Sequence, residues 1–339
     1  MTIQAPRYTH AAIRALLGNK VRLVATPLGR FFGSDRLLGM ALRCLTSPMV
    51  PKADVYYTGA QTLPNVVGPS LRRLLYPKRR FVVVVHHLIE EESRKRAGAR
   101  SQIPLLAERL ALKIVRIAAT HVLPGSQFAK EQLGLLRFHP KRLTMTENAP
   151  SNRAIVESPP DAQRDSTVIY LGNLSKRKGA IDILSAWPDI SRAHVSAKLL
   201  AIGQLDPTDA PSVRAALERA GPTATVANDL NDLQVATTLA RASIFAATSL
   251  EEGWGIAVAE AMRAGLAAVT YDLPAYEPVF GRSTRLVVPI GDVRAFAAAV
   301  IQLLSDPKLR IDLARKGQEH VRRYSWQQIA AREAQFFTA

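Results

Sequence analysis

The stretch TSLEEGWGIAVAEAMRAGLAAVTYDLPAYE, residues 248–277, decides the fold of this chain. A strand-like run at 243–247 precedes it, and residues 256–263 are apolar on nearly every side, which predicts a buried helix. Glu260 lies in the middle of that helix, where an unpaired carboxylate would be costly. Because no neighbour in sequence pairs with Glu260, we expect its partner elsewhere in the fold or in a ligand.

Two glycines, Gly253 and Gly255, flank Trp254 directly before this helix. Glycine lets the backbone approach a ligand closely, and the first N–H groups of a helix form an anion site. On these residues alone two interpretations stay open. One is a site for an anionic ligand, and the other is an ordinary tight turn followed by a helix whose Glu reaches solvent.

The pattern S-x-x-E-G-W-G-x-x-x-x-E-A-M-x-x-G, from Ser249 to Gly265, carries a family resemblance. With the following AAVTYD and LPAYEPV, it resembles the donor-binding core of retaining nucleotide-sugar glycosyltransferases of the E-x7-E family (family 4-like, glycosyl transferases group 1). The resemblance implies an α/β chain of GT-B architecture, with two Rossmann-like domains facing across a cleft. It also implies an acceptor domain at 1–150, a donor-binding domain at 151–320, and a closing helix within 321–339 that crosses back to the first domain.

Composition fits a globular chain of two ordinary domains, with 339 residues, 47% hydrophobic and 22% charged. The single cysteine, Cys44, excludes an intrachain disulfide and fits a reducing compartment. Residues 1–10 lack the apolar core of a signal peptide, and no apolar run approaches the roughly 20 residues that span a bilayer. We therefore expect a cytoplasmic protein, either soluble or peripheral on the inner face of the membrane.

Positive charge is concentrated in the first half of the chain. Residues 1–150 hold 24 Lys and Arg against 8 Asp and Glu, whereas residues 151–339 hold 21 against 20. Such asymmetry suggests that the first half faces something anionic, such as phosphate-bearing lipid, a membrane surface or nucleic acid. The alternative is a basic surface that only keeps the protein in solution.

Alternating strand and helix patterns in the first half predict a parallel sheet. Strands are expected at 21–26, 54–57, 81–85, 120–123 and 143–146, and helices at 9–17, 105–118 and 126–133, the last capped by Ser126. The family opens with a strand and a glycine-rich loop, and neither is expected here ahead of the 9–17 helix. Either the translation start is set too late, or the first domain is built differently.

Two features of the first half are candidate functional elements. His86 follows the buried strand 81–85, at the strand end where open α/β sheets bind ligands. The resemblance implies that His86 contacts the donor sugar, and a solvent-facing His is the alternative.

The pattern of residues 68–81 predicts a basic amphipathic element that faces a membrane surface or the acceptor, with an ordinary surface helix as the alternative. Its leucines are Leu71, Leu74 and Leu75, and its basic residues are Arg72, Arg73, Lys78, Arg79 and Arg80.

The second half repeats the alternating pattern after a linker at 151–166. Strands are expected at 168–171, 198–202, 224–229 and 285–288, and helices at 180–186, 233–240, after Asp292, and at 326–337. The segment GNLSKRKG, residues 172–179, resembles the family's phosphate-binding turn and places Lys178 on the lysine that neutralises the donor diphosphate. Asn173 stands where the family usually has Arg, so Lys176 or Arg177 would supply the missing charge; a merely structural basic turn is the alternative.

The resemblance assigns the remaining site residues. Glu260 would hold the ribose hydroxyls, while Glu252 and the backbone around Trp254 would bind the sugar and phosphate. The catalytic candidates are His86, Lys178 and Glu252, and the donor-binding set is Gly172, Asn173, Lys178, Ser249, Glu252, Gly253, Trp254, Gly255 and Glu260. No residue cluster has metal-ligand spacing, so neither a metal nor another cofactor is expected.

The resemblance implies a metal-independent retaining glycosyltransferase. Its partners would be a nucleoside-diphosphate sugar donor, a glycan or lipid-linked acceptor and an anionic membrane surface. Two rivals stay open: a catalytically silent GT-B protein that binds nucleotide sugars, and a GT-B sugar-nucleotide epimerase. Nucleic-acid binding rests only on the basic half, since no recognition motif accompanies it.

Overall fold

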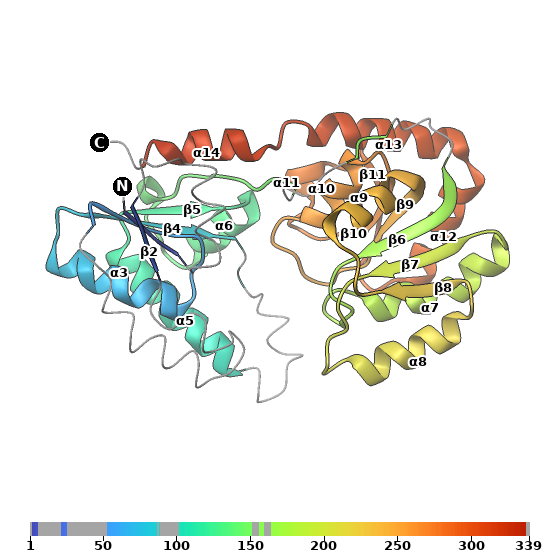
Figure 1. The fold of residues 1–339 in the computed structure, drawn as a ribbon, viewed down its shortest axis with the longest axis horizontal. Coiled ribbons are helices and arrows are strands. Elements are labelled where there is room, and N and C mark those ends of the chain that lie inside the picture. Colours follow the sequence, from blue (N-terminus) through green and yellow to red (C-terminus); the bar gives the residue numbers. More distant parts are fainter. Residues whose placement is uncertain are drawn as a thin grey trace. The chain divides into compact units, whose positions relative to one another are not determined.

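The chain forms two compact units. The computed structural model describes residues 2–5, 22–25, 53–86, 88, 102–150, 156–158 and 164–336. Unit 1 comprises Met1–Glu147 with Ala330–Ala339, and unit 2 comprises Asn148–Ile329. Figure 1 shows that each unit is built from parallel strands and helices, as the sequence predicts for an α/β chain.

Unit 1 contains a parallel sheet in the order β3-β4-β5, made of Val55–Thr58, Arg80–Val85 and His121–Pro124. Its helices are α3 (Leu63–Leu75), α5 (Gln102–Ala118) and α6 (Gln127–Leu135). Residues of all three helices pack in one core with Phe81, Val83 and Val85. On the opposite face, Val82 and Val84 pack against Phe336 from the C-terminal segment. The strand is therefore buried on both faces, as its unbroken β-branched run predicts.

Two expectations for unit 1 were wrong. Thr2–Ala5 forms strand β1, paired in parallel with β2 (Arg22–Ala25), although no strand was expected ahead of residue 9. The short, mixed segment before Pro6 carries too little apolar periodicity to predict it. The strand expected at 143–146 is only a bridge between Leu143 and Val122, preceded by a short 3-10 helix at Pro140–Arg142. The helix expected at 9–17 lies outside the described residues.

Unit 2 contains a six-stranded parallel sheet in the order β11-β10-β9-β6-β7-β8. Its strands are β6 (Asp165–Leu171), β7 (Lys198–Ile202), β8 (Ala224–Ala227), β9 (Ala242–Ala247), β10 (Ala267–Tyr271) and β11 (Arg285–Val288). The chain builds outward from β6 through β7 to β8, and then returns to the other side of β6 for β9. The sheet order therefore reverses between β6 and β9, which are neighbours.

Helices cover both faces of this sheet (Figure 1). One core joins the sheet to α7 (Ala180–Ala193), α8 (Ala210–Ala220) and α12 (Val293–Ser305), and the other joins it to α9 (Asp232–Arg241), α10 (Ile256–Arg263) and α11 (Glu277–Phe280). Helix α13 (Pro307–Val321) contributes to both, and α14 (Trp326–Ala334) follows it. Alternate β9 residues face the two cores, with Ile244 on one side and Phe245 on the other.

Candidate donor site in unit 2

The candidate site lies where the strand order of unit 2 reverses. The loop 172–179 follows β6, and the turn 248–255 follows β9, so both leave the carboxyl edge of neighbouring parallel strands. In open α/β sheets, ligands bind at this edge beside such a reversal. The topology alone therefore marks these two loops, and they contain most of the predicted donor-binding residues.

Lys178, Ser249 and Glu252 meet at this position. Lys178 Nζ lies 2.6 Å from Glu252 Oε1, and the Ser249 hydroxyl donates to the same oxygen at 2.9 Å. The Lys178 and Glu252 side chains are 22% and 19% exposed, so the pair is sheltered but open to a ligand. Both contacts of the carboxylate, among the described residues, are made through Oε1.

Backbone contacts hold the two loops together. The Leu250 amide donates to the Arg177 carbonyl at 3.0 Å, and the Thr248 hydroxyl donates to the Gly179 carbonyl at 2.7 Å. Gly179 has a positive φ of 70°, and a Cβ at this position would overlap the Thr248 carbonyl. Glycine is therefore required here both by the backbone conformation and by the approach of the neighbouring loop.

Gly255 is needed for aromatic packing. It is the N-cap of α10 with φ 99°, and a Cβ there would lie 2.7 Å from the Tyr276 ring and 2.9 Å from the Phe280 ring. Trp254 is 3% exposed and packs edge-on against Phe280 and Tyr324, with ring centroids 5.9 and 5.1 Å apart. The Trp254 ring is thus part of the core.

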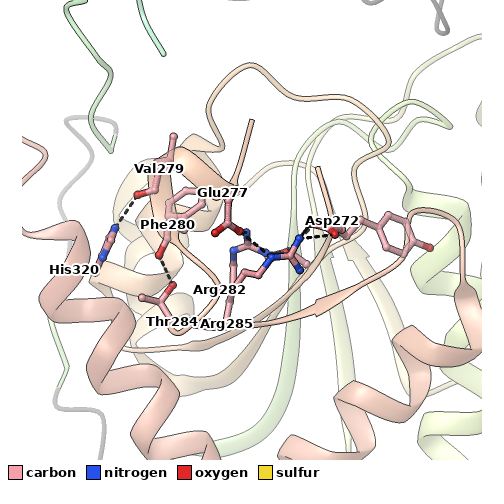
Figure 2. Close-up of polar contacts among 10 residues, drawn as sticks. Asp272, Glu277, Val279, Phe280, Arg282, Thr284, Arg285 and His320 are labelled. Carbon is pink, nitrogen blue, oxygen red and sulfur yellow. Dashed lines mark hydrogen bonds and ion pairs between the residues drawn. The ribbon is translucent and has the colours of Figure 1, made fainter. Parts of the chain in front are cut away.

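Polar contacts connect residues within the segment 272–285, which contains Tyr276 and Phe280 (Figure 2). Arg282 donates to both carboxylate oxygens of Asp272, at 2.9 and 2.8 Å, and its Nε lies 3.3 Å from Glu277. The fully buried Arg285 side chain donates to the Thr270 hydroxyl at 2.7 Å and reaches Glu277 at 3.7 Å. These contacts, together with the bond from the Thr284 hydroxyl to the Phe280 carbonyl, stabilise the segment 272–285, whose Tyr276 and Phe280 rings lie next to Gly255.

The other predicted donor residues differ in exposure. Glu260 is buried on α10, at 4% exposed, as the apolar pattern predicts. Gly172 is half-buried and Gly253 is buried at the two loops. The side chain at Asn173 is exposed, as are those of Lys176 and Arg177, so the two basic side chains do not pack against the body of unit 2.

Sequence reasoning missed two buried tyrosines beside Glu252. The Tyr170 hydroxyl shares its one proton between the carbonyls of Asn173 and Lys178, at 2.8 and 3.0 Å, and the buried Tyr276 phenol lies near Ser249. Burial, reinforced by the charge of Glu252, raises the pKa of both phenols well above 10, which keeps both hydroxyls protonated. Their partners are backbone atoms or lie far away in sequence, so no local motif could reveal them.

Unit 1 holds the predicted His86 and the basic segment 68–81. His86 is exposed at the carboxyl end of β4. On α3, Leu71, Leu74 and Leu75 are 42%, 59% and 68% exposed, so the leucines do not pack on the sheet. Arg79 is ion-paired with Asp54, and Arg80 donates to the Phe336 carbonyl at 3.4 Å. The remaining basic residues of the segment are Arg72 and Arg73, both half-buried, and Lys78, which is exposed.

Neither a metal cluster nor a membrane span is found in the part of the chain that the structure describes. No three His, Cys, Asp or Glu side chains gather there in an arrangement that could hold a metal ion. Within the same residues, every helix is too short or too polar to cross a bilayer.

Comparison with known proteins relates this chain to glycosyltransferases. A phosphatidyl-myo-inositol mannosyltransferase from Mycolicibacterium smegmatis is 33% identical over 172 residues, which make up 49% of this chain and 43% of that protein. The GDP-mannose:cellobiosyl-diphosphopolyprenol alpha-mannosyltransferase from Xanthomonas campestris is 26% identical over 67% of this chain and 59% of that protein. The match therefore spans less than half the length of the mycobacterial relative.

Solved structures share the fold at low sequence identity. Anabaena HepE in complex with UDP-glucose has a TM-score of 0.74 at 16% identity, covering 99% of this chain and 91% of that chain. Sucrose-phosphate synthase from Thermosynechococcus elongatus has a TM-score of 0.72 at 19% identity, covering 94% of this chain and 82% of that chain. These likenesses confirm the predicted α/β, GT-B fold. The model of the family described as glycosyl transferases group 1 matches residues 152–320, and this segment of the chain belongs to that family.

Proposed function

We propose that this chain is a retaining glycosyltransferase. It moves a hexose-type sugar from a nucleoside-diphosphate sugar to a glycan or lipid-linked acceptor, in the synthesis of a cell-surface polysaccharide or glycolipid. The observation that carries the proposal is the meeting of Lys178, Ser249 and Glu252 at the strand-order reversal, within the half that matches the family.

The proposed chemistry uses fixed charges to stabilise the departing group. The Lys178 ammonium neutralises charge on the nucleoside diphosphate as the bond between the anomeric carbon and the phosphate oxygen breaks. The acceptor hydroxyl oxygen bonds to the anomeric carbon on the same face, and its proton passes to the leaving phosphate. Glu252 and the backbone of Gly253–Gly255 bind the sugar and phosphate, Glu260 binds the ribose hydroxyls, and His86 is a further contact to the sugar.

Donor binding is the first test of this proposal. The Xanthomonas relative is named for GDP-mannose and the HepE structure holds UDP-glucose, so these two donors should be titrated first, together with GDP and UDP. We expect thermal stabilisation by one of the two nucleotide families, with Glu260→Ala abolishing it. Unchanged calorimetric affinity in Glu260→Ala would contradict the assigned role.

Turnover distinguishes the proposal from its two rivals. We expect transfer of the sugar to an acceptor. NMR should show that an α-linked donor gives an α-linked product, and the activity should persist in the presence of a chelator. Binding without turnover would favour the silent binder, for which the uncharged Asn173 is the supporting observation. Sugar conversion without any acceptor would indicate an epimerase.

The α3 surface of unit 1 is proposed to contact an anionic bilayer, which would bring the enzyme to a lipid-linked acceptor. Exposed Leu74 and Leu75 lie beside the exposed Lys78, and apolar side chains with neighbouring cations fit an anionic lipid surface. Leu74→Ser with Leu75→Ser should reduce sedimentation with phosphatidylglycerol vesicles. Val195→Ser, an 86% exposed site on unit 2, serves as the matched control. Equal sedimentation of both variants would contradict this surface.

A further inference from the structure

The loop that carries Lys178 is shaped by one buried hydroxyl group. It connects the end of β6 to the start of α7, and it holds three consecutive basic residues, Lys176, Arg177 and Lys178. Three neighbouring cations repel one another, and their sequence alone does not determine which of them points toward the site. In the folded unit, Lys178 nevertheless turns to Glu252 at 2.6 Å, while Lys176 and Arg177 are exposed.

Two backbone contacts of the loop account for part of this arrangement. The Lys176 amide donates to Asp209 at 2.7 Å, and the Arg177 carbonyl accepts from the Leu250 amide at 3.0 Å. These bonds fix the residues that precede Lys178. The backbone carbonyl of Lys178 itself has a different partner.

That partner is Tyr170, one residue before the end of β6. Its hydroxyl lies 3.0 Å from the Lys178 carbonyl and 2.8 Å from the Asn173 carbonyl, so one phenol spans both ends of the basic loop. Tyr170 is 2% exposed and its ring belongs to the core beneath the sheet, which makes the hydroxyl a fixed point. Because burial and the charge of Glu252 raise the pKa of this phenol, it remains a donor across the working pH range.

We propose that Tyr170 is a positioning residue whose hydroxyl holds the Lys178 backbone so that its ammonium group faces the donor diphosphate. The inference rests on the proposed function of this site and extends it to a residue that contacts no substrate. Without the hydroxyl, the Lys178 carbonyl loses its contact with Tyr170, while the Asn173 carbonyl keeps the bond from the Ser175 amide at 2.9 Å, so the Lys178 end of the loop gains freedom to turn toward solvent.

Tyr170→Phe is the direct test, because it removes one oxygen atom and keeps the ring. Tyr271→Phe is the matched control: Tyr271 lies in the same core and donates its hydroxyl at 2.8 Å to the Asp182 side chain, in the first turn of α7, and not to a backbone carbonyl of the basic loop. Calorimetry with UDP and GDP on the full chain should show about tenfold weaker binding for Tyr170→Phe, which is the order expected for losing a buried hydrogen bond. Tyr271→Phe should bind within about twofold of wild type, although both lose a buried phenolic bond.

A double-mutant cycle with Lys178→Ala separates positioning from a general effect on folding. If Tyr170 acts through Lys178, Tyr170→Phe should weaken nucleotide binding no further in the Lys178→Ala background. An undiminished tenfold loss in that background, equal losses in the two Phe variants, or wild-type affinity in Tyr170→Phe would each overturn the inference. Failure of wild type to bind either nucleotide would instead overturn the proposed function, and the inference with it.

Discussion

Replacing Gly179 by Ala tests the close approach of the two site loops. A Cβ at Gly179 would lie 1.7 Å from the Thr248 carbonyl oxygen. The oxygen belongs to the backbone and the Cβ is bonded directly to Cα, so neither can move aside as the end of a flexible side chain would. The loops must separate by well over an ångström. Such separation would break the bond between the Thr248 hydroxyl and the Gly179 carbonyl, and the bond between Leu250 and Arg177.

The expected magnitude follows from these losses. A positive φ costs a residue other than glycine about 1–2 kcal/mol, and the two hydrogen bonds contribute about 1 kcal/mol each. Gly179→Ala should therefore lower the free energy of unfolding by about 3–4 kcal/mol. Gly291→Ala is the matched control, because Gly291 has a similar φ of 79° with nothing within 4 Å of its added Cβ, so it should cost only about 1–2 kcal/mol.

Thermal and urea unfolding of both variants, followed by nucleotide calorimetry, make the comparison. For a unit of this size, the difference of about 2 kcal/mol corresponds to a Tm difference of about 4–8 °C. Nucleotide affinity should fall in Gly179→Ala and stay unchanged in Gly291→Ala. Equal Tm values and equal affinities in the two variants would refute the packing of loop 172–179 on the turn after β9.

Three further predictions concern other parts of unit 2. Glu252→Gln should leave nucleoside-diphosphate affinity within about threefold of wild type but slow sugar transfer at least about a hundredfold; comparable initial rates would contradict this. Arg164 donates to the carbonyls of Ala242 and Ala264, both at 2.8 Å, so Arg164→Ala should lower the free energy of unfolding by about 3 kcal/mol. Arg192 is exposed, so Arg192→Ala should lower it by less than about 0.5 kcal/mol in the same urea titration. Burial, with the Arg323 charge, lowers the pKa of His320, so the unfolded chain binds a proton at this residue before the folded chain does as pH falls. The Tm should therefore fall below about pH 6.5, and it should fall less in His320→Gln. Identical pH profiles of the wild type and the variant would contradict this role of His320.

Much of the fold was predictable because its apolar runs are unambiguous. The predicted bounds of α10 and β11 coincide with the observed Ile256–Arg263 and Arg285–Val288. Ser126 and Asp292 were predicted as helix entry residues, and each accepts a hydrogen bond from a backbone amide in the first turn. Short polar side chains before an apolar period specify such caps locally.

Some of the elements that were missed have weak local signals. Helix α13 (Pro307–Val321) is rich in polar residues, and packing against the sheet stabilises it. Helix α8 (Ala210–Ala220) was missed although Val213, Ala216 and Ala220, which are buried, recur at helical spacing. Within the site, the motif identified Lys178 and Glu252, but the 2.6 Å pair between them depends on neighbouring strands that lie far apart in sequence. The roles of these residues in transfer stay predictions.

The split composition of unit 1 has a consequence for biosynthesis. Glu333 accepts hydrogen bonds from Tyr57 and Thr146, both at 2.7 Å, and Phe336 completes the core against Val82 and Val84. A ribosome makes residues 330–336 only after all of unit 2, so the contacts of Glu333 and Phe336 with the rest of unit 1 form only once the whole of unit 2 has been made. We therefore expect unit 1 to reach its final stability after unit 2, against the usual order in which the N-terminal domain matures first, and we expect residues 1–147 expressed alone to be less stable than in the full chain.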